Sequence, residues 1–516
     1  MHEIDRRHFV GLVAAGAAMA LARPSEAAET FELDEVTAGE LQEGMRTGRF
    51  TARAIAEEYL RRIEAVDKHG PAINAVIELN PDALAIAEER DRERKSGPLR
   101  GPLHGIPVLI KDNIDTADRM HTSAGSLALA ESIAPRDAAV VRRLREAGAV
   151  VLGKTNLSEW ANFRSTHSTS GWSGRGGLTK NPYILDRNAC GSSSGTGAAI
   201  SANLAALGVG TETDGSVVCP SSANGLVGIK PTVGLLGGSG IVPIAHSQDT
   251  AGPMCRTVTD AALLLGALAG HDYTSALDRD GLRGARIGVA RKFFGFNDAT
   301  DRVMKEAIEA MKRCGATIVD PVELPTSAKY DDDELEVLLF EFKSGINKYL
   351  ATLGANVRTR TLADLIKFND EHRDAEMPYF GQELFMRAEA RGPLTDPKYR
   401  KARAKCLRLS RAEGIDAVMA KHKLDAVIAP TGGPVWLTDL PNGDHFTGGY
   451  STPSAVAGYP HVTVPAGMAF GLPIGISFFA GPRSEARLIK LAYAFEQATK
   501  ARRKPGFRSA AVPAAG

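Results

Sequence analysis

Residues 190–197 read Cys-Gly-Ser-Ser-Ser-Gly-Thr-Gly, and residues 210–216 read Gly-Thr-Glu-Thr-Asp-Gly-Ser. These two stretches decide how the chain is interpreted, because they place hydroxyls and glycines where an ordinary core would have apolar side chains. Glycine lets backbone N–H groups approach a ligand closely, and a serine hydroxyl can act as a nucleophile or a proton relay. A lone lysine, Lys111, follows the apolar residues 108–110. Together these features predict a hydrolytic site that uses no histidine.

The composition is that of a globular protein with a large core. The 516 residues have a net charge of +1, with 43% hydrophobic and 24% charged residues. A nearly neutral chain provides no basic field for nucleic acid or for an anionic membrane, so neither is expected as a partner. The glycines gather between residues 171 and 252, which points to a site rather than to general flexibility.

The cysteines and the common catalytic motifs exclude several classes of site. No Cys-x-x-Cys pair occurs, and the odd number of cysteines leaves at least one thiol free or paired between chains. Cys190 and Cys219 flank the two loops, where we expect buried packing rather than chemistry. No P-loop or His-Glu-x-x-His motif marks the loops, and no Gly-x-Ser-x-Gly motif stands around Ser216. Neither a metal nor a cofactor is therefore expected.

The N-terminus resembles a twin-arginine export signal over residues 1–27. Arg6 and Arg7 precede an apolar run at 10–22, and small residues stand at 27–28. The run is too short for a comfortable membrane span, which needs about 20 residues. We therefore expect a periplasmic or secreted protein, cleaved near Ala27, with no membrane association after the signal is removed.

Helical and strand patterns alternate through residues 28–516, which predicts one domain of the α/β class. Residues 330–415 are charged and mostly helical, and we interpret them as an insertion or cap. Helices are expected within 31–70 (with Thr51 as a cap), at 138–147, 198–207 and 301–313, and from 155–160. Buried strands are expected at 108–110, 150–152, 207–210, 225–231, 286–290, 316–319, 426–430 and 461–465.

Lys111 is the candidate base. A serine hydroxyl must lose its proton to attack a carbonyl, and an ordinary lysine, with a pKa of ~10.4, is neutral in only about one molecule in a thousand near pH 7.4. Burial away from acids can lower that pKa by about 3 units or more. Residues 108–110 offer such burial, and Asp112 need not pair with Lys111 because successive strand residues point to opposite faces.

The lysine and the two loops resemble the amidase signature family. Its pattern reads Gly-x-Ser-Ser/Gly-Ser/Gly-Gly and, after a helix and a strand, Gly-Thr-Asp/Glu…Gly-Ser-Ile-x-x-Pro. Residues 191–195 and 210–220 match it, with Ser192 and Ser216 at the family's spacing. Segments 105–113, 153–160 and 225–232 are also similar. The resemblance runs from about residue 35 to about 495 and implies a large mixed β-sheet covered by helices on both faces.

The resemblance also implies a role for each site residue. Ser216 is expected to be the nucleophile, Ser192, in a cis peptide bond, the proton relay, and Lys111 the base. For Asn113 and Thr211, loop hydrogen bonding is an equally good interpretation. The remaining expected groups are the backbone N–H groups of an oxyanion hole at Thr213, Asp214, Gly215 and Ser216, and supporting groups at Ser193 and Thr211.

The implied function is hydrolysis of a carboxamide through an acyl-serine intermediate, without metal or cofactor. Val218, where many members have arginine, and Cys190-Gly191, where many have Gly-Gly, are similar to the branch that contains peptide amidases. A peptide's terminal amide is therefore the leading substrate class. Two alternatives stay open: an A-type amidotransferase subunit that frees ammonia from glutamine for a partner, and a non-catalytic binding protein with the same fold.

Overall fold

A computed structural model describes residues 32–510 of the chain, and the predicted export signal lies outside them. The chain divides into two units, Met1–Asp34 and Glu35–Gly516. All helices and strands of the described residues belong to the second unit. None of the helices between residues 32 and 510 combines the length and apolar character needed to cross a bilayer.

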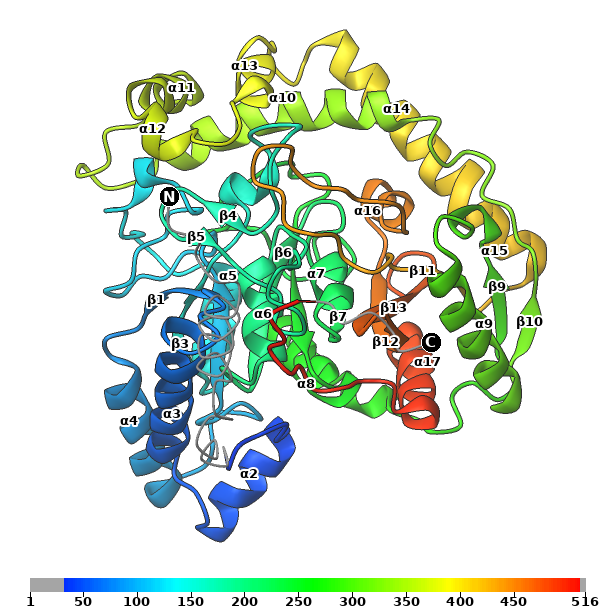
Figure 1. The fold of residues 1–516 in the computed structure, drawn as a ribbon, viewed down its shortest axis with the longest axis horizontal. Helices are drawn as coiled ribbons and strands as arrows, with labels where there is room; N and C mark the ends of the chain where they lie inside the picture. Colours follow the sequence, from blue (N-terminus) through cyan, green and yellow to red (C-terminus); the bar gives the residue numbers. More distant parts are fainter. Residues whose placement is uncertain (1–31, 511–516) are drawn as a thin grey trace, which may run out of the picture. The chain divides into compact units, whose positions relative to one another are not determined.

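A mixed sheet of eleven strands runs through the second unit, in the order β1-β3-β2-β6-β8-β7-β12-β13-β11-β9-β10 (Figure 1). Its strands are β1 (Val76–Leu79), β2 (Pro107–Lys111), β3 (Val150–Thr155), β6 (Leu207–Glu212), β7 (Val227–Lys230), β8 (Thr250–Cys255), β9 (Arg286–Val289), β10 (Thr317–Val319), β11 (Ala426–Pro430), β12 (His461–Ala469) and β13 (Leu472–Phe479). β2 is parallel to β3 and β6, whereas β6 is antiparallel to β8. A separate two-stranded ribbon consists of β4 (Trp172–Ser173) and β5 (Gly177–Leu178).

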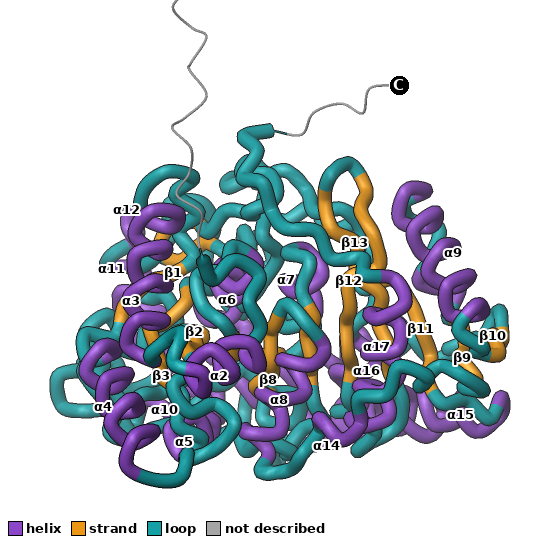
Figure 2. The backbone as a smooth tube through the Cα atoms, turned by 90° about the horizontal axis from the view of Figure 1, so that it is seen from below, coloured by secondary structure: helices purple, strands orange, loops and turns teal. Residues whose placement is uncertain are grey.

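Helices pack on the sheet in two groups. In the first group, α6 (Ser194–Ser201) contacts α7 (Val218–Ala223), and both lie on central strands. In the second, α8 (Val258–Ala269) contacts α5 (Ala139–Glu146) and α17 (Glu485–Thr499), and α17 contacts α9 (Asp298–Arg313). Figure 2 shows the strands, in orange, between purple helices. The predicted α/β class, a large mixed sheet with covering helices, is confirmed. The helices are α2 (Ala38–Thr47), α3 (Ala52–Arg62), α4 (Ala83–Ser96), α5 (Ala139–Glu146), α6 (Ser194–Ser201), α7 (Val218–Ala223), α8 (Val258–Ala269), α9 (Asp298–Arg313), α10 (Asp331–Leu350), α11 (Leu362–Glu371), α12 (Arg373–Glu376), α13 (Glu383–Glu389), α14 (Pro397–Ser410), α15 (Asp416–His422), α16 (Thr452–Ala457) and α17 (Glu485–Thr499).

Most predicted elements are present, and the differences have local causes. The Thr51 hydroxyl caps α3, as expected, by accepting a hydrogen bond from the Ala54 N–H at 3.0 Å. The helix expected from 155–160 is wrong, because Thr155 still belongs to β3 and Trp160 adopts a positive φ of 50°. The helix expected at 198–207 instead begins at Ser194 and ends at Ser201.

The early start of α6 depends on backbone packing rather than on helix propensity. Gly195 lies in its first turn, where a Cβ atom would come within 2.4 Å of the carbonyl oxygens of Ala75 and Asn156. Glycine costs about 1 kcal/mol relative to alanine inside a helix. Here the missing side chain lets α6 approach the β1 and β3 segments closely enough to fix the serine loop against the sheet.

The segment 330–415 is helical, as predicted, and comprises α10–α14 with a short π-helical turn, Arg411–Ile415. α10 and α14 run along the upper edge of Figure 1. These helices share a hydrophobic core with the body of the unit, in which the rings of Trp160 and Phe385 meet edge to face at 5.9 Å. The Tyr349 hydroxyl also donates to the Asp115 carboxylate at 2.8 Å. The segment is therefore packed onto the residues that surround the site.

Candidate active site

Lys111 is the last residue of β2, at the carboxyl end of a strand held between two parallel neighbours. Its side chain is fully buried. The Nζ atom donates to Ser192 Oγ at 2.7 Å, to Thr211 Oγ1 at 2.9 Å and to the Thr211 carbonyl at 3.3 Å. Asn113 Nδ2 donates to the same Thr211 hydroxyl at 3.0 Å. The lysine amine is thus surrounded by neutral oxygen atoms.

Burial lowers the pKa of the Lys111 amine to about 7, and the carboxyl groups of Asp249 and Glu212 oppose this shift. Burial also raises the pKa of Asp249 to about 7 and that of Glu212 above its usual range, which weakens the opposition. A neutral amine is therefore accessible near neutral pH, as a lysine base requires.

The Ser192 segment is held in an unusual backbone conformation. Cys190 has a positive φ of 54°, and the Gly191–Ser192 peptide bond is cis, as the family resemblance implies. A Cβ atom on Gly191 would lie 2.3 Å from Ser158 Oγ, so only glycine fits there. The Ser158 N–H donates to the Ser192 carbonyl at 3.0 Å. Ser158 therefore supports the backbone of the Ser192 segment, a role that the sequence did not single out.

The two serine loops meet through their backbones. The Ser193 N–H donates to the Ser216 carbonyl at 3.2 Å. Ser193 Oγ donates to the Thr211 carbonyl at 3.1 Å and accepts from the Thr211 N–H at 3.2 Å, which ties the first loop to β6. Ser193 and Thr211 are thus bonded to each other beside Lys111, and their supporting role stays a prediction. Ser194 Oγ donates to the Cys190 carbonyl at 2.5 Å and stabilises the turn before Ser192.

Ser216 precedes α7 by two residues and is 8% exposed, in contrast to the fully buried Lys111. Within residues 32–510 its hydroxyl forms no hydrogen bond, so the link from Ser216 to Ser192 is not formed in this state. Catalytic hydrogen bonds are often long in unliganded structures and tighten only around the substrate. The structure therefore brings together Lys111 and Ser192 directly, and Ser216 through the backbone of Ser193.

Residues 213–216 form the turn between β6 and α7. Their four N–H groups donate no hydrogen bond to any other described residue. Thr213 Oγ1 donates to the Asp249 carboxylate at 2.6 Å, and Thr452 Oγ1 donates to the Asp214 carboxylate at 2.6 Å. Gly215 has a positive φ of 82°. The turn is thus anchored by its side chains while its N–H groups stay available to an oxyanion.

Glu212 and Asp249 are site residues that the sequence interpretation missed. Glu212 Oε2 accepts from the N–H groups of Val217 and Val218 at 2.8 and 3.0 Å, which fixes the start of α7 just after Ser216. Asp249 also accepts from the N–H groups of residues 244 and 245. Glu212 could have been identified from the sequence, because an acid at the end of a predicted buried strand is unusual. Asp249 could not, because it is 33 residues from Ser216 and only the fold brings the two close.

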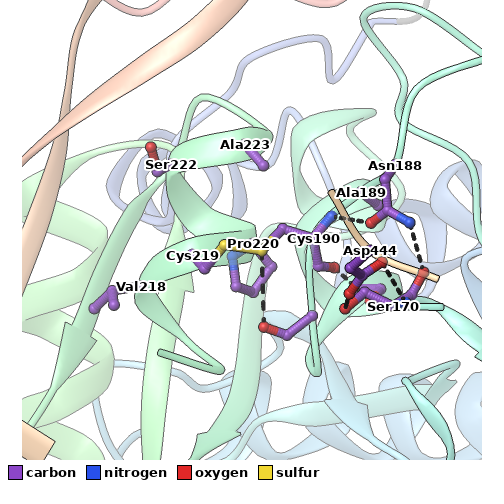
Figure 3. The surroundings of a disulfide bond; sticks show 12 residues. Ser170, Asn188, Ala189, Cys190, Val218, Cys219, Pro220, Ser222, Ala223 and Asp444 are labelled. Carbon is purple, nitrogen blue, oxygen red and sulfur yellow. Dashed lines mark hydrogen bonds between the residues drawn. A yellow bond between two sulfur atoms is a disulfide. The ribbon is translucent and has the colours of Figure 1, made fainter. Parts of the chain in front are cut away.

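Cys190 and Cys219 correct a prediction. They were expected to have a buried packing role, with their pairing left open, but they form a disulfide, with 6.0 Å between their Cα atoms (Figure 3). Their approach could not be read from a separation of 29 residues, because it depends on how α6 and α7 dock. Cys255, Cys314 and Cys406 are free thiols, as the odd number required.

Residues 431–451, which we call the strap, connect β11 to α16 and border both serine loops. Directly after the strap, Thr452, the first residue of α16, donates to Asp214 as described above. Along its course, the Asp444 carboxylate accepts from the Ser170 N–H at 2.9 Å, and Ser170 lies against Gly191. Trp436 and Phe446 of the strap meet edge to face and line a small cavity together with Cys219 (Figure 3 shows its disulfide). The strap thus contributes two aromatic rings to a cavity beside Cys219, three residues after Ser216.

Comparisons with known proteins agree with this geometry. The sequence profile described as Amidase matches residues 54–489. The chain therefore belongs to the amidase family, and it is a hydrolase that acts on amides.

Similar proteins extend over nearly the whole chain. A probable amidase of Arabidopsis thaliana is 42% identical over 503 residues, which cover 93% of each chain. The crystal structure of the native peptide amidase of Stenotrophomonas maltophilia is 50% identical, with a TM-score of 0.88, and the match covers 92% of this chain and 99% of that one. The A-type subunit of the glutamyl-tRNA(Gln) amidotransferase of Thermoanaerobacter pseudethanolicus is 32% identical, over 92% of this chain and 99% of its own length.

Proposed function

We propose that this amidase hydrolyses the C-terminal carboxamide of peptides, through an acyl intermediate on Ser216 and a Ser216–Ser192–Lys111 relay. The single observation that carries the relay is the hydrogen bond of 2.7 Å between Ser192 Oγ and a fully buried lysine amine. The peptide substrate class is supported by the similarity to the Stenotrophomonas maltophilia peptide amidase.

The proposed reaction begins with proton movement toward Lys111. Ser216 Oγ attacks the amide carbon while its proton passes to Ser192, whose own proton passes to the neutral lysine amine. The N–H groups of residues 213–216 stabilise the resulting oxyanion, which is commonly the largest electrostatic contribution to acyl transfer. The relay then returns the proton to the leaving nitrogen, ammonia departs, and water releases the acid from Ser216 by the same route.

The strap favours a peptide over a small hydrophilic amide. Leu437 and Phe446 are 53% and 56% exposed, respectively, although both are large and apolar. Phe446 also lines the cavity that Cys219 borders, and Cys219 stands three residues after Ser216, so this exposed ring lies near the nucleophile segment. An apolar residue of a peptide amide would cover them as its terminal carboxamide reaches Ser216.

A panel of amides tests the proposal. Wild-type protein is incubated with an N-acyl dipeptide amide, an aliphatic amide, an aryl amide and glutamine, and ammonia release is followed with mass detection of acylated Ser216. We expect turnover of the peptide amide, loss of turnover and acylation in Ser216→Ala, and near-normal turnover in Ser221→Ala. Ser221 is a matched control, because it is a buried serine in the same segment whose hydroxyl has no hydrogen-bond partner among the described residues. Acylation elsewhere would contradict the assignment of Ser216.

The amidotransferase alternative is supported by the 32% identity to the A-type subunit of a glutamyl-tRNA(Gln) amidotransferase. It predicts glutamine hydrolysis and copurification with a second subunit from the cytoplasm. The third alternative, a non-catalytic binding protein, predicts that a fluorophosphonate does not label Ser216. The amide panel separates all three, because only the amidase proposal predicts peptide amide turnover by the isolated chain.

An exported location is part of the same proposal. It is supported by the twin arginines at Arg6 and Arg7, and by the disulfide, since structural disulfides persist in oxidising compartments and are rare in the cytosol. Fractionation of cells that express the full chain should recover it in the periplasm or medium, starting near residue 28. Replacement of both arginines by lysine should retain it in the cytoplasm. An uncleaved cytoplasmic wild-type chain would contradict this part of the proposal.

A further inference from the structure

The Cys190–Cys219 disulfide joins the two segments that carry the proposed catalytic serines. Cys190 stands two residues before Ser192, and Cys219 stands three residues after Ser216. No other disulfide occurs among residues 32–510. The bond is therefore a covalent connection between the relay loop and the nucleophile segment (Figure 3).

Each cysteine is coupled to the catalytic groups by short local contacts. On the relay side, the Cys190 N–H donates to Asn188 Oδ1 at 2.7 Å, and its carbonyl accepts from Ser194 Oγ at 2.5 Å. On the nucleophile side, the Cys219 N–H donates to the Gly215 carbonyl at 2.7 Å. A displacement of one cysteine relative to the other would thus move Ser192 relative to the turn that presents Ser216.

Hydrogen bonds also join the two segments, and they do not depend on the disulfide. Asn224 Nδ2 donates to the Ala189 carbonyl at 2.9 Å, and the Ser193 N–H donates to the Ser216 carbonyl at 3.2 Å. These contacts should hold the fold together when the disulfide is reduced. They do not fix the position of the Ser192 hydroxyl relative to the Ser216 hydroxyl, since no hydrogen bond joins these two groups in the described structure.

Cys219 is the more accessible of the two bridged cysteines. Cys219 is partly exposed and lines the small cavity that Trp436 and Phe446 also border, whereas Cys190 is only 4% exposed. Attack by a thiolate at the Cys219 sulfur would release the Cys190 thiol, and the second thiol of a dithiol would then release Cys219. The dithiol is oxidised to a cyclic disulfide, and the two cysteines gain the two electrons and two protons.

We propose that the Cys190–Cys219 disulfide positions Ser192 against Ser216, so that its reduction by a dithiol lowers turnover while the chain stays folded. Both cysteines are positioning residues, because neither touches the reacting atoms. The inference rests on the proposed function, in which the two serines carry the proton relay. It goes beyond that function by making the activity sensitive to the redox state of the compartment.

The test compares oxidised and reduced protein. Full-length wild-type chain is treated with excess dithiothreitol, desalted under nitrogen and assayed with an N-acyl dipeptide amide, and the rate of Ser216 labelling by a fluorophosphonate is measured in parallel. We expect kcat and the labelling rate to fall roughly ten- to a hundredfold, with KM and the circular dichroism spectrum nearly unchanged. Reoxidation should restore the activity.

Variants separate the bond from other thiol effects. Cys190→Ser/Cys219→Ser should behave like the reduced wild type and should not respond to dithiothreitol, whereas Cys314→Ser, which removes a free thiol away from the serine loops, should behave like the wild type in both states. Reduced protein that is folded and fully active would overturn the proposal, and so would unfolding on reduction, because the bond would then stabilise the fold rather than align the serines. Amide turnover by the oxidised chain tests the proposed function separately.

Discussion

Lys111 and Lys154 stand on adjacent strands, β2 and β3, and both are fully buried, yet their surroundings differ. Lys111 donates only to neutral oxygens, those of Ser192 and Thr211. Lys154 also donates to neutral groups, the Ile114 carbonyl at 2.7 Å and the Thr122 hydroxyl at 2.9 Å. The two lysines differ in the charges at longer range, because Lys154 is exposed to the electrostatic field of four carboxyl groups: Asp112, Asp115, Asp118 and Glu78.

Burial lowers the pKa of both lysines, but the acidic groups that oppose this lowering differ between the two. Lys111 is opposed by two acids, and burial raises the pKa of both. Lys154 is opposed by four, and burial raises the pKa of Asp112 and Asp115 as well. Against the effect of burial, however, hydrogen bonds from Arg175 and His121 hold the pKa of Glu78 below its usual value, so an ionised carboxylate stays near Lys154. The comparison indicates that burial alone does not make a lysine a base. The amine must also be kept apart from ionised acids and must have a hydroxyl within reach, and only Lys111 meets both conditions.

The largest effect is expected from Lys111→Met. Removal of the amine should lower kcat/KM by about 10²–10⁴-fold, the range of a lost general base. The free energy of unfolding should change little, because a desolvated amine is removed. Amide turnover and urea unfolding measure the two quantities. Lys111→Arg should be equally inactive, since guanidinium stays protonated. A Lys111→Met protein that keeps near-normal turnover would remove the lysine mechanism.

Lys154→Met should show the opposite pattern. It leaves the Ile114 carbonyl and the Thr122 hydroxyl without their donor among several buried acids, so the free energy of unfolding should fall by about 3 kcal/mol. The folded fraction should retain most of its amide turnover. Urea unfolding followed by circular dichroism, with activity normalised to the folded fraction, measures both. Loss of turnover without loss of stability would mean that the two lysines do not differ in the proposed way.

The pH dependence gives a third distinction. Because the pKa of Lys111 is lowered to about 7, the neutral amine is lost below that pH, and kcat/KM should fall about tenfold per pH unit on the acid side. The same shift has a defined sign for stability: the cost of the buried amine is fully present below pH 7 and decreases as the pH rises toward the usual value of 10.5. A buffered rate profile checks the first part. A rate that does not change through pH 7 would contradict it.

The smallest effect is expected from Thr211→Val, which removes the hydroxyl that accepts from Lys111 and Asn113. Turnover should fall about tenfold, the equivalent of one lost hydrogen bond. The acid limb of the rate profile should move to lower pH, because the protonated amine loses an acceptor. Thr211→Ser should restore both quantities. An unchanged pH profile in Thr211→Val would show that this hydroxyl does not tune the lysine.

Much of the site was predictable because its chemistry is encoded locally. The apolar residues before Lys111 predicted a buried strand end, and the motif around Ser192 and Ser216 predicted the cis bond and the turn before α7 through the family resemblance. Asp112 forms no hydrogen bond with Lys111 in the described structure, as strand alternation allowed: its carboxylate accepts a hydrogen bond from the Ser123 hydroxyl.

The features that were missed depend on tertiary packing. Gly195 was interpreted as part of a ligand-binding loop, but its lack of a side chain serves the contact between α6 and the β3 segment. The anchor of Thr213 on Asp249 joins segments whose contact is created only by the pairing of β6 with β8. The disulfide likewise required knowledge of how α6 and α7 meet. Strands such as β1 and β13 were not expected, because the first is short and the second is completed by its partner β12.

The disulfide has a practical consequence for chemical mapping. No lysine or arginine stands between Arg187 and Lys230, so a protease that cuts after basic residues leaves both serines and both bridged cysteines on one fragment. The mass of that fragment reports two events together: an acyl adduct adds its own mass, and opening the sulfur bridge adds two hydrogens. One spectrum therefore shows, for each molecule, whether Ser216 carries an acyl group and whether the disulfide-closed ring that contains both serines is oxidised or reduced.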